Sequence, residues 1–380
     1  MRLGIAGLGN AGHAVVRNLK KAPGVELTSV ADVRKETLES FRDRGGVRLF
    51  DRVEEMCASK EIDAVWIATP NEFHAQHTIT AANRGKHVIL EKPMALSLEE
   101  CDRMIAAAEK NGIKLLMHSK VSEPPVVKMR EVVASGRLGR VIQISTWNYK
   151  GWLDSARLPS ELDTTKGGGV LYRQGPHQID IVRYIGGGMV KSARGSVGRW
   201  NPCFDTEGNF TAFLEFEDGT PATLVFNGYG YFDITELTWD IGEGGRIVSE
   251  RYKKKERPKG PVDPAVRYAM PLRAETRKHK GDRKQPFYGL TLVSCERGDI
   301  RQSPDGLYLY TEEGREELLC DAHLDRGQEL VKLRDAVSRD TPVFPDGRWG
   351  QASLEVALAV LQSARERREI QLCCQVPVPQ

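Results

Sequence analysis

Residues 1–32 read MRLGIAGLGNAGHAVVRNLKKAPGVELTSVAD, and this stretch decides the fold of the N-terminal part of the chain. A short apolar run at residues 2–6 stops at the sequence GLGNAG, residues 7–12, and apolar residues at helical spacing follow. A second apolar run, residues 25–31, ends at Asp32. Strand, Gly-x-Gly-x-x-Gly, helix, strand and acid is the order of the dinucleotide-binding fingerprint. The stretch therefore predicts an α/β Rossmann sheet with a dinucleotide bound at its first turn.

The residues of this turn have separate expected roles in cofactor binding. Gly7 permits the tight turn, Gly9 lets the backbone approach the pyrophosphate, and Gly12 lets the helix pack on the strand. Asn10 and Ala11 open the helix, whose free N–H groups and positive dipole end attract phosphate. All five positions are predicted to bind the cofactor.

The choice of cofactor depends on Asp32. An acid about 20–25 residues after the glycines can accept hydrogen bonds from both ribose hydroxyls and repels a 2′-phosphate. Arg34 lies close enough in sequence to pair with such a phosphate, which keeps NADP as the alternative. We expect NAD, with NADP less favoured.

Further apolar runs continue the pattern of the first 32 residues. They lie at residues 64–68, 87–90 and 114–117 and alternate with helical patterns at residues 75–83 and 98–111. This alternation is typical of a doubly wound parallel sheet with helices on both faces. Ligands of such sheets bind beyond the carboxyl ends of the strands.

Two loops follow neighbouring strands at that end of the predicted sheet. They contribute Thr69, Pro70 and Asn71 after one strand, and Glu91 and Lys92 after the next. A lysine that is partly desolvated near a nicotinamide can exchange a proton with a hydroxyl, although most lysines are solvated surface residues. Because Lys92 directly follows an apolar strand at the cofactor end, the catalytic interpretation is favoured.

Two histidines lie three residues apart on the helix after the first of these loops. His74 and His77 would need a third ligand of matching type to bind a metal, and none is near in sequence. A surface or capping role is therefore favoured, and no metal site is expected.

Several motifs together resemble the glucose-fructose oxidoreductase and inositol dehydrogenase (Gfo/Idh/MocA) family. They are GLGNAG, Asp32, TPNEFH at residues 69–74, GKHVILEKPMA at residues 85–95 and GGGVLYRQGPHQID at residues 167–180. The resemblance implies a Rossmann domain, placed at residues 1–120. It implies a second α/β domain on a large, open, mostly antiparallel sheet, placed at residues 121–380. It also implies homodimers or homotetramers that associate through sheet faces.

The resemblance assigns roles to individual residues. Lys92 would act in proton transfer, and His177 would bind and polarise the reacting hydroxyl. The family's usual third partner is an aspartate four residues before that histidine, where this chain has Arg173. This departure argues against a polyol substrate. The loop residues implied to contact the cofactor are Thr69, Pro70, Asn71, His74, Glu91 and Lys92.

Four further stretches resemble the phthalate cis-dihydrodiol dehydrogenases within that family. They lie at residues 118–130, 147–152, 157–169 and 286–310. The resemblance implies NAD-dependent oxidation of a small anionic substrate, a ring diol with carboxylates, to the dihydroxy aromatic. The candidate substrate residues are Arg173, Asp180, Arg157, Lys166, Tyr149, Trp152 and His118. Tyr149 and Trp152 are equally well interpreted as ordinary strand aromatics.

Arg173 needs an anionic partner if it is desolvated. A protein acid such as Asp180 or Glu161 would make it structural, whereas a substrate carboxylate would bind both arms of its guanidinium. Arg157 and Lys166 precede the same motif and are candidates for a second carboxylate. Both alternatives for Arg173 stay open at this point.

The second domain has weaker local signals. Residues 141–146, 210–217 and 221–226 are predicted strands, and residues 351–367 a long amphipathic helix. The C-terminal VPVPQ is expected to fray.

Composition narrows the class of protein. With 55 basic and 52 acidic residues among 380, the chain has a net charge of +3, and no apolar run is long enough to span a membrane. The N-terminus lacks a signal-peptide pattern and the seven cysteines include no CxxC, so we expect a cytoplasmic protein without a disulfide framework or zinc ribbon. Residues 246–284 carry 14 basic and 5 acidic side chains and are predicted to form a basic loop insertion. It is better interpreted as a rim that steers an anionic substrate than as a nucleic-acid site.

Two alternatives to a dihydrodiol dehydrogenase remain. One is a sugar, sugar-acid or inositol dehydrogenase of the same family. The other is an NAD-binding regulatory protein without turnover, against which the presence of both Lys92 and His177 argues.

Overall fold

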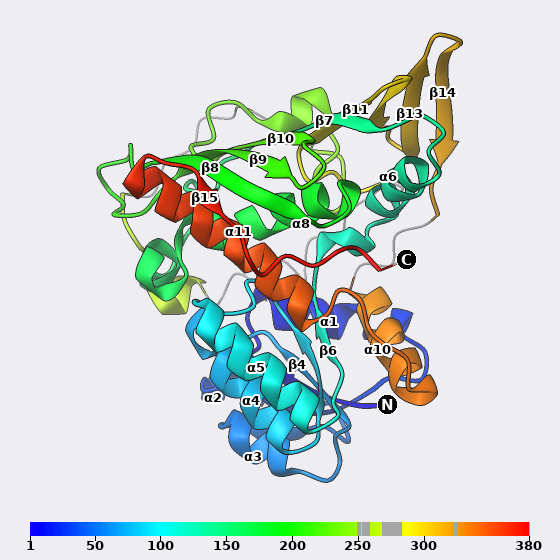
Figure 1. Cartoon of the computed structure of the whole chain (residues 1–380). Helices are drawn as coiled ribbons and strands as arrows, with labels where there is room; N and C mark the ends of the chain where they lie inside the picture. Colours follow the sequence, from blue (N-terminus) through cyan, green and yellow to red (C-terminus); the bar gives the residue numbers. More distant parts are fainter. Residues whose placement is uncertain (249–251, 253–258, 268–282, 322–325, 380) are drawn as a thin grey trace. The chain divides into compact units, whose positions relative to one another are not determined.

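The computed structural model describes all residues except 249–251, 253–258, 268–282, 322–325 and 380 (Figure 1). The chain divides into two compact units. The first contains Met1–Ser119 and Leu324–Leu354, and the second contains Lys120–His323 and Glu355–Gln380. Residues 121–380 were predicted to form the second domain. The contacts of Leu324–Leu354 place this segment in the first unit instead.

The first unit is built on a six-stranded sheet of parallel strands in the order β3-β2-β1-β4-β5-β6. Its strands are β1 Arg2–Ala6, β2 Glu26–Ala31, β3 Arg48–Phe50, β4 Ala64–Ile67, β5 His87–Leu90 and β6 Leu115–Met117. β4 is buried along its whole length, as expected for a parallel strand covered on both faces. The predicted Rossmann sheet is confirmed.

Helices and short 3-10 turns connect these strands. They are α1 Asn10–Asn18, η1 Leu19–Lys21, α2 Lys35–Glu39, α3 Val53–Ala58, η2 Asn71–Phe73, α4 His74–Asn83, α5 Leu98–Lys110 and α10 Gly327–Arg339. The start of α5 is set by Ser97, whose hydroxyl accepts a hydrogen bond from the backbone N–H of Glu100 at 3.2 Å. α10 belongs here because Leu330 and Leu333 are buried in the same core as Leu3 of β1. Because the apolar face of α10 packs into this core, Leu324–Leu354 belong to the first unit.

The second unit contains a nine-stranded sheet in the order β14-β13-β12-β11-β7-β10-β9-β8-β15. Among the described strands of this second sheet, only the pairing of β7 with β10 is parallel, so the predicted mostly antiparallel sheet is confirmed. The strands are β7 Val141–Tyr149, β8 Val190–Gly198, β9 Asn209–Phe216, β10 Pro221–Asn227, β11 Leu290–Cys295, β12 Gly298–Gln302, β13 Gly306–Thr311, β14 Gly314–Leu319 and β15 Ile370–Gln371.

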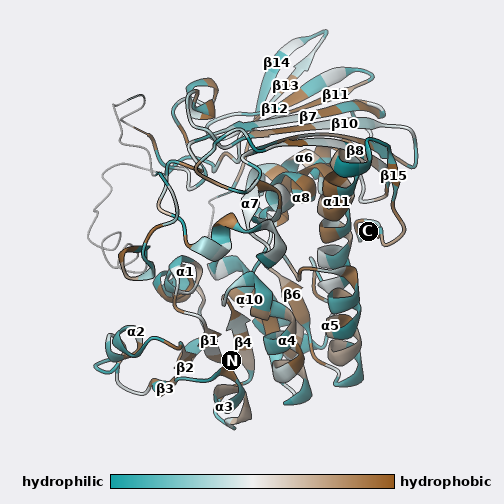
Figure 2. Cartoon of the chain, turned by 90° about the vertical axis from the view of Figure 1, so that its left-hand side faces the viewer, coloured by the Kyte–Doolittle hydropathy of each residue, from teal (hydrophilic) through white to brown (hydrophobic). Residues whose placement is uncertain are grey.

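Helices cover one face of this sheet (Figure 2). They are α6 Pro124–Ala134, α8 Gly175–Ile185 and the second half of α11 Gly347–Glu366, with η3 Lys120–Ser122, η4 Pro159–Leu162, η5 Thr164–Lys166, α7 Gly169–Arg173 and η6 Ile234–Leu237 in the connections. Leu214 of β9, Val182 of α8 and Val356 of α11 lie in one buried cluster, while Phe213 on the opposite face of β9 is 42% exposed. One sheet face is thus packed and the other open.

Two predicted boundaries and the predicted fraying of the C-terminus were wrong. β7 continues past residue 146 to Tyr149, since it pairs with β10 along that length. α11 begins at Gly347 rather than residue 351, because the carboxylate of Asp346 accepts from the N–H of Trp349 at 2.9 Å. The C-terminal VPVPQ does not fray over its described residues, since the N–H of Val378 donates to the carbonyl of Gly187 at 3.0 Å. None of the described helices is long and apolar enough to cross a bilayer.

Candidate active site

The glycine turn has the shape required to hold a pyrophosphate. Gly7 has φ +87°, and a Cβ there would lie 2.6 Å from the carbonyl oxygen of Ala68. A Cβ on Gly12 would lie 2.0 Å from the carbonyl oxygen of Gly7, so α1 can approach β1 only through a glycine. A Cβ on Gly9 would meet nothing within 4 Å, which leaves open space where α1 starts. Asn10 and Ala11 form the first turn of α1, as predicted.

Asp32 is anchored to this turn from the end of β2. Its Oδ2 accepts a hydrogen bond from the backbone N–H of Leu8 at 2.7 Å, and its two oxygens accept from Nε and Nη2 of Arg34 at 2.8 Å each. Asp32, which was predicted to bind the ribose, therefore forms an ion pair with Arg34, which was considered as a ligand of the 2′-phosphate of NADP. The glycine turn and Asp32 together fit a dinucleotide. The turn would hold its pyrophosphate, and Asp32 would hold its ribose.

His74 joins the two loops at the carboxyl ends of β4 and β5. Its Nδ1 lies 2.7 Å from the carbonyl oxygen of Pro93, and its Nε2 lies 3.0 Å from that of Thr69. Burial lowers the pKa of His74 to about 4. Of the surface or capping role expected for this residue, the surface alternative was wrong, because the ring is buried between the loops it connects. His77 is partly buried and places its Nδ1 3.0 Å from Oγ1 of Thr69; Pro70 and Asn71 complete that loop.

Lys92 is half-buried and follows a strongly anchored carboxylate. Glu91 Oε1 accepts from Nε and Nη2 of Arg326 at 3.0 and 2.9 Å. Burial alone would raise the pKa of Glu91, but the charges of Arg326, His118 and Lys92 lower it to about 2. The backbone on both sides of Lys92 is thus held, by Arg326 through Glu91 and by His74 through Pro93.

His118 also has a protein partner in the first unit. Its Nδ1 lies 3.1 Å from Oε1 of the buried Glu329 on α10, and its ring lies against Trp66 with centroids 5.9 Å apart. The sequence predicted His118 as a substrate residue, and it had not predicted this contact with Glu329.

In the second unit, His177 packs against a buried tyrosine. The rings of His177 and Tyr288 meet edge to face with centroids 4.8 Å apart, and the Tyr288 hydroxyl lies 2.9 Å from both the backbone and the side-chain oxygen of Gln174. The ammonium groups of Lys120 and Lys150 lie 5.4 and 5.1 Å from the centre of the Tyr288 ring. We call His177, Tyr288, Lys120 and Lys150 the Tyr288 cluster.

The lysines of the Tyr288 cluster each contact an acid. Nζ of Lys120 lies 2.5 Å from Oε1 of Glu123, and Lys150 forms an ion pair with Glu243. Burial lowers the pKa of Lys150, while the charge of Glu243 opposes this shift. Burial also raises the pKa of Tyr288 well above 10, so its hydroxyl stays protonated and can donate a hydrogen bond. The cluster thus combines two ion-paired lysines, one hydroxyl and an imidazole.

Arg173 lies in a group of three arginines around one buried acid, which we call the Glu161 cluster. Oε1 of Glu161 lies 2.7 Å from Nη2 of Arg173 and 3.8 Å from Nη1 of Arg157, and Oε2 lies 3.3 Å from Nε of Arg267. Burial lowers the pKa of Arg157 to about 10, so the group remains charged at neutral pH. Glu161, one of the two protein acids considered as partners of Arg173, binds it.

The remaining predicted substrate residues have other protein neighbours or are exposed. The buried Asp180 interacts electrostatically with Arg183, and Lys166 is exposed. Trp152 is buried under the guanidinium of Arg157, which lies 4.2 Å from its ring centre. Tyr149 meets Phe232 edge to face at 5.7 Å. Both aromatics thus have protein neighbours; Tyr149 is the last residue of β7, whereas Trp152 lies outside any strand.

Sequence reasoning missed residues of both clusters and Arg326, the partner of Glu91. Lys150 directly follows β7, where a lysine after aromatic residues was the available signal. No local signal marks Tyr288 or Arg326, whose partners are far away in sequence. Arg267 was counted only as one charge of the basic tract, most of which lies outside the described residues.

Comparisons with known proteins match both halves of the chain. A profile described as an oxidoreductase family with an NAD-binding Rossmann fold matches residues 1–119, and that of the Gfo/Idh/MocA C-terminal domain matches residues 126–247. The chain is 30% identical over 377 residues to the 1-carboxy-3-chloro-3,4-dihydroxycyclo hexa-1,5-diene dehydrogenase of Comamonas testosteroni, covering 96% of this chain and 95% of the relative. It is 31% identical over 385 residues to the myo-inositol 2-dehydrogenase of Thermotoga maritima, covering 98% of each.

A solved structure agrees along the whole chain. The crystal structure of a protein from Bordetella bronchiseptica RB50 that is assigned as a dehydrogenase has a TM-score of 0.85 and 35% identity, and the match covers 98% of this chain and 100% of that one. The predicted NAD cofactor is confirmed by the NAD-binding family match at residues 1–119.

Proposed function

The chain belongs to the Gfo/Idh/MocA family of NAD-binding oxidoreductases, and on that premise we propose that it oxidises a carboxylated cyclic cis-dihydrodiol to the dihydroxy aromatic. The observation that carries this proposal is the Glu161 cluster. At the position where the family has an aspartate for polyol hydroxyls, this chain has Arg173, and Arg157 and Arg267 lie beside it. A cationic group suits a substrate carboxylate better than it suits an uncharged polyol.

The ion pair with Glu161 is compatible with this role. A guanidinium has five N–H donors, so an arginine that binds a protein carboxylate through one arm is not thereby excluded from binding a second one. Glu161 also keeps the three guanidiniums close together, which their mutual repulsion would otherwise oppose. We therefore assign Glu161 the role of organising the arginines.

The relative from Comamonas testosteroni supports the same substrate class. Its name describes a ring diol that carries one carboxylate, and its match covers 96% of this chain. The phthalate-type substrate suggested by the sequence has two carboxylates. Arg173 is assigned to the first, and Arg157 and the exposed Lys166 remain candidates for the second.

Bound NAD would supply the acceptor for the hydride that leaves the carbinol carbon. We assign removal of the hydroxyl proton to Nζ of Lys92, whose backbone is held by the contacts of Glu91 and Pro93. We assign binding of the hydroxyl to His177, whose ring is held by Tyr288. The ketone that results can tautomerise to a catechol, and the gain of aromaticity draws the reaction forward.

The test is NADH formation by the purified protein on three substrates. We expect the catalytic efficiency on a carboxylated cis-dihydrodiol to exceed that on the same diol without carboxylate by about 30-fold or more, which corresponds to about 2 kcal/mol. The third substrate, myo-inositol, should be oxidised least. A preference for myo-inositol or a sugar would overturn the proposal.

The second candidate function is a sugar or inositol dehydrogenase. It is favoured by the match to the myo-inositol 2-dehydrogenase of Thermotoga maritima over 98% of both chains. The same three-substrate assay distinguishes it, because this candidate predicts little benefit from a carboxylate.

We further propose that the protein is a homo-oligomer associated through the open sheet face. Trp147, Phe213 and Leu292 are 42%, 42% and 37% exposed on β7, β9 and β11, which lie within four successive strands. Apolar side chains grouped in this way favour a protein interface. We place the reaction in the cytoplasm, where a reducing environment suits seven cysteines that form no disulfide in the structure.

A further inference from the structure

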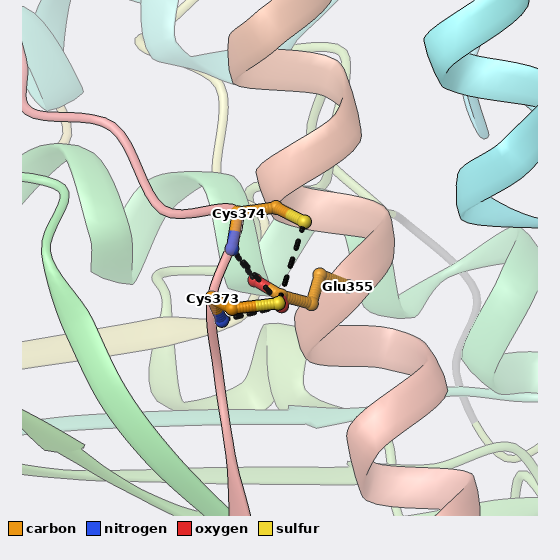
Figure 3. A group of neighbouring side chains, drawn as sticks. All are labelled: Glu355, Cys373 and Cys374. Carbon is orange, nitrogen blue, oxygen red and sulfur yellow. Dashed lines mark hydrogen bonds between the residues drawn. The ribbon is translucent and has the colours of Figure 1, made fainter.

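Two adjacent cysteines lie beside a buried carboxylate near the end of the chain (Figure 3). Cys373 and Cys374 follow β15, and Glu355 lies on α11. The two Sγ atoms are 3.8 Å apart, and one carboxylate oxygen and both sulfurs lie within 4.8 Å of one another. Cys373 is exposed, so the group can be reached from solvent.

The backbone of the two cysteines is held in place by Glu355. Oε1 accepts from the N–H of Cys373 at 2.6 Å and of Cys374 at 3.1 Å. Oε2 accepts from the N–H of Cys374 at 2.9 Å and from Nε2 of Gln375 at 2.7 Å. Hydrogen bonds of Leu372 and Val378 to the loop before β8 and its first residues anchor the chain on both sides. The thiols are therefore positioned without any ligand, which lowers the entropy cost of binding one.

The sulfur spacing suits a metal ion better than a disulfide. Two thiolates at the usual 2.3 Å from a tetrahedral zinc ion are about 3.8 Å apart, which is the distance between these sulfurs. A disulfide requires the sulfurs to approach to about 2.05 Å and the Cα atoms to be about 4.4–6.8 Å apart. Adjacent residues have Cα atoms only about 3.8 Å apart, so a bond between Cys373 and Cys374 would be strained.

We propose that Cys373, Cys374 and Glu355 form a binding site for a thiophilic divalent cation of the zinc type. Both thiols lose a proton to solvent as two metal–sulfur bonds form, and no electrons are transferred. One oxygen of Glu355 exchanges its longest amide contact, that with Cys374 at 3.1 Å, for the metal. A water molecule completes the four ligands. Hard cations such as Mg²⁺ should not bind, because they prefer oxygen ligands.

This site uses none of the residues assigned to the oxidation of the diol. No metal site was predicted from the sequence, which contains no CxxC pair and in which His74 and His77 lack a third ligand nearby. The group was not visible there because Glu355 is 18 and 19 residues from the two cysteines.

The experiment titrates Zn²⁺ and Cd²⁺ into the reduced, chelator-treated full-length protein. We expect one ion per chain, and with Cd²⁺ the ultraviolet charge-transfer absorption of cadmium thiolates. The double variant Cys373→Ser/Cys374→Ser should lose this absorption and bind Zn²⁺ ~100-fold or more weaker, and Glu355→Gln should keep the absorption but bind about tenfold weaker.

The matched control is Cys203→Ser, since Cys203 is also exposed and lies elsewhere in the second unit. This variant should bind both ions like the wild type. Thermal unfolding of all variants, measured in parallel, confirms that they fold. Zn²⁺ binding that is equal in the wild type and the double variant would overturn the proposal, as would loss of the cadmium absorption in Cys203→Ser.

Discussion

Substitution of Arg173 by glutamine separates a substrate contact from a structural ion pair. Nη2 of Arg173 lies 2.7 Å from Oε1 of Glu161, but the same carboxylate keeps Arg267 at 3.3 Å and Arg157 at 3.8 Å. Arg173→Gln therefore does not leave Glu161 as a buried charge without a cation. The Arg173 side chain is also 28% exposed, which weakens its ion pair through solvent screening. We expect the free energy of unfolding to fall by no more than about 1–2 kcal/mol.

The effect on a carboxylated substrate should be larger. A hydrogen bond to a charged group contributes about 1.5–3 kcal/mol, and a carboxylate bound by both arms of a guanidinium lies in the upper part of this range. A loss of about 2–3 kcal/mol lowers kcat/KM by ~30- to 150-fold. Because the contact is present in the ground state, the loss should appear mainly as a raised KM. An uncharged dihydrodiol makes no such contact, so its kcat/KM should change by less than about threefold.

The assay measures NADH formation on the two diols, with denaturant unfolding of the same preparations. Lys191→Gln is the matched control, because it removes an ion-paired positive charge of the second unit that is not among the candidate substrate residues. Screening by solvent and salt should limit its effect to about threefold or less. Equal losses of kcat/KM on the charged and the uncharged diol in Arg173→Gln would refute the reasoning, since they would show that Arg173 only supports the fold.

Three other predictions concern the proton-transfer residue, its anchor and the open sheet face. Lys92→Met should lower kcat by about 100-fold or more with NAD affinity unchanged in a binding titration, and unchanged turnover would move proton transfer to another group. The pKa of Glu91 is about 2 against an ordinary 4.5, so its ionisation contributes stability, about 3 kcal/mol, that is present above pH 4.5 and lost as the pH falls toward 2. Arg326→Gln should therefore destabilise the protein more at pH 7 than at pH 3 in urea unfolding, and an equal loss at both would contradict the assignment. Trp147→Glu should convert an oligomer to monomers in analytical ultracentrifugation with NAD binding retained, whereas an unchanged mass would place the interface elsewhere.

The fold of the first unit could be predicted from the sequence because its signals are local. The fingerprint of residues 7–12 and each apolar run act over a few residues, and parallel strands buried on both faces leave continuous apolar runs in the sequence. The same logic placed Lys92 at the carboxyl end of β5, since a loop directly after a strand has a known position. Of the helices near the end of the chain, only α11 had a clear pattern of apolar residues at helical spacing, and its predicted start was four residues too late.

The second unit depended on the resemblance for its architecture. Its strands are short and its sheet joins β11 to β7, which are separated by more than 140 residues in sequence. Strand pairing over such distances is decided by which apolar faces pack together, and no local window contains that information.

Only the tertiary structure decided which charged side chains form ion pairs with one another. Arg326 reaches Glu91 over 235 residues, and Arg267 reaches Glu161 over 106. The sequence alone left open whether Arg173 pairs with a protein acid, such as Asp180 or Glu161, or with a substrate carboxylate, because an ionic contact depends on a separation of a few ångströms and not on spacing along the chain. The same holds for Glu355 and the two cysteines. The sequence determined which groups the chain carries and, near its strands, at which edge they lie; folding determined which of them meet, because only packing brings distant side chains within bonding distance.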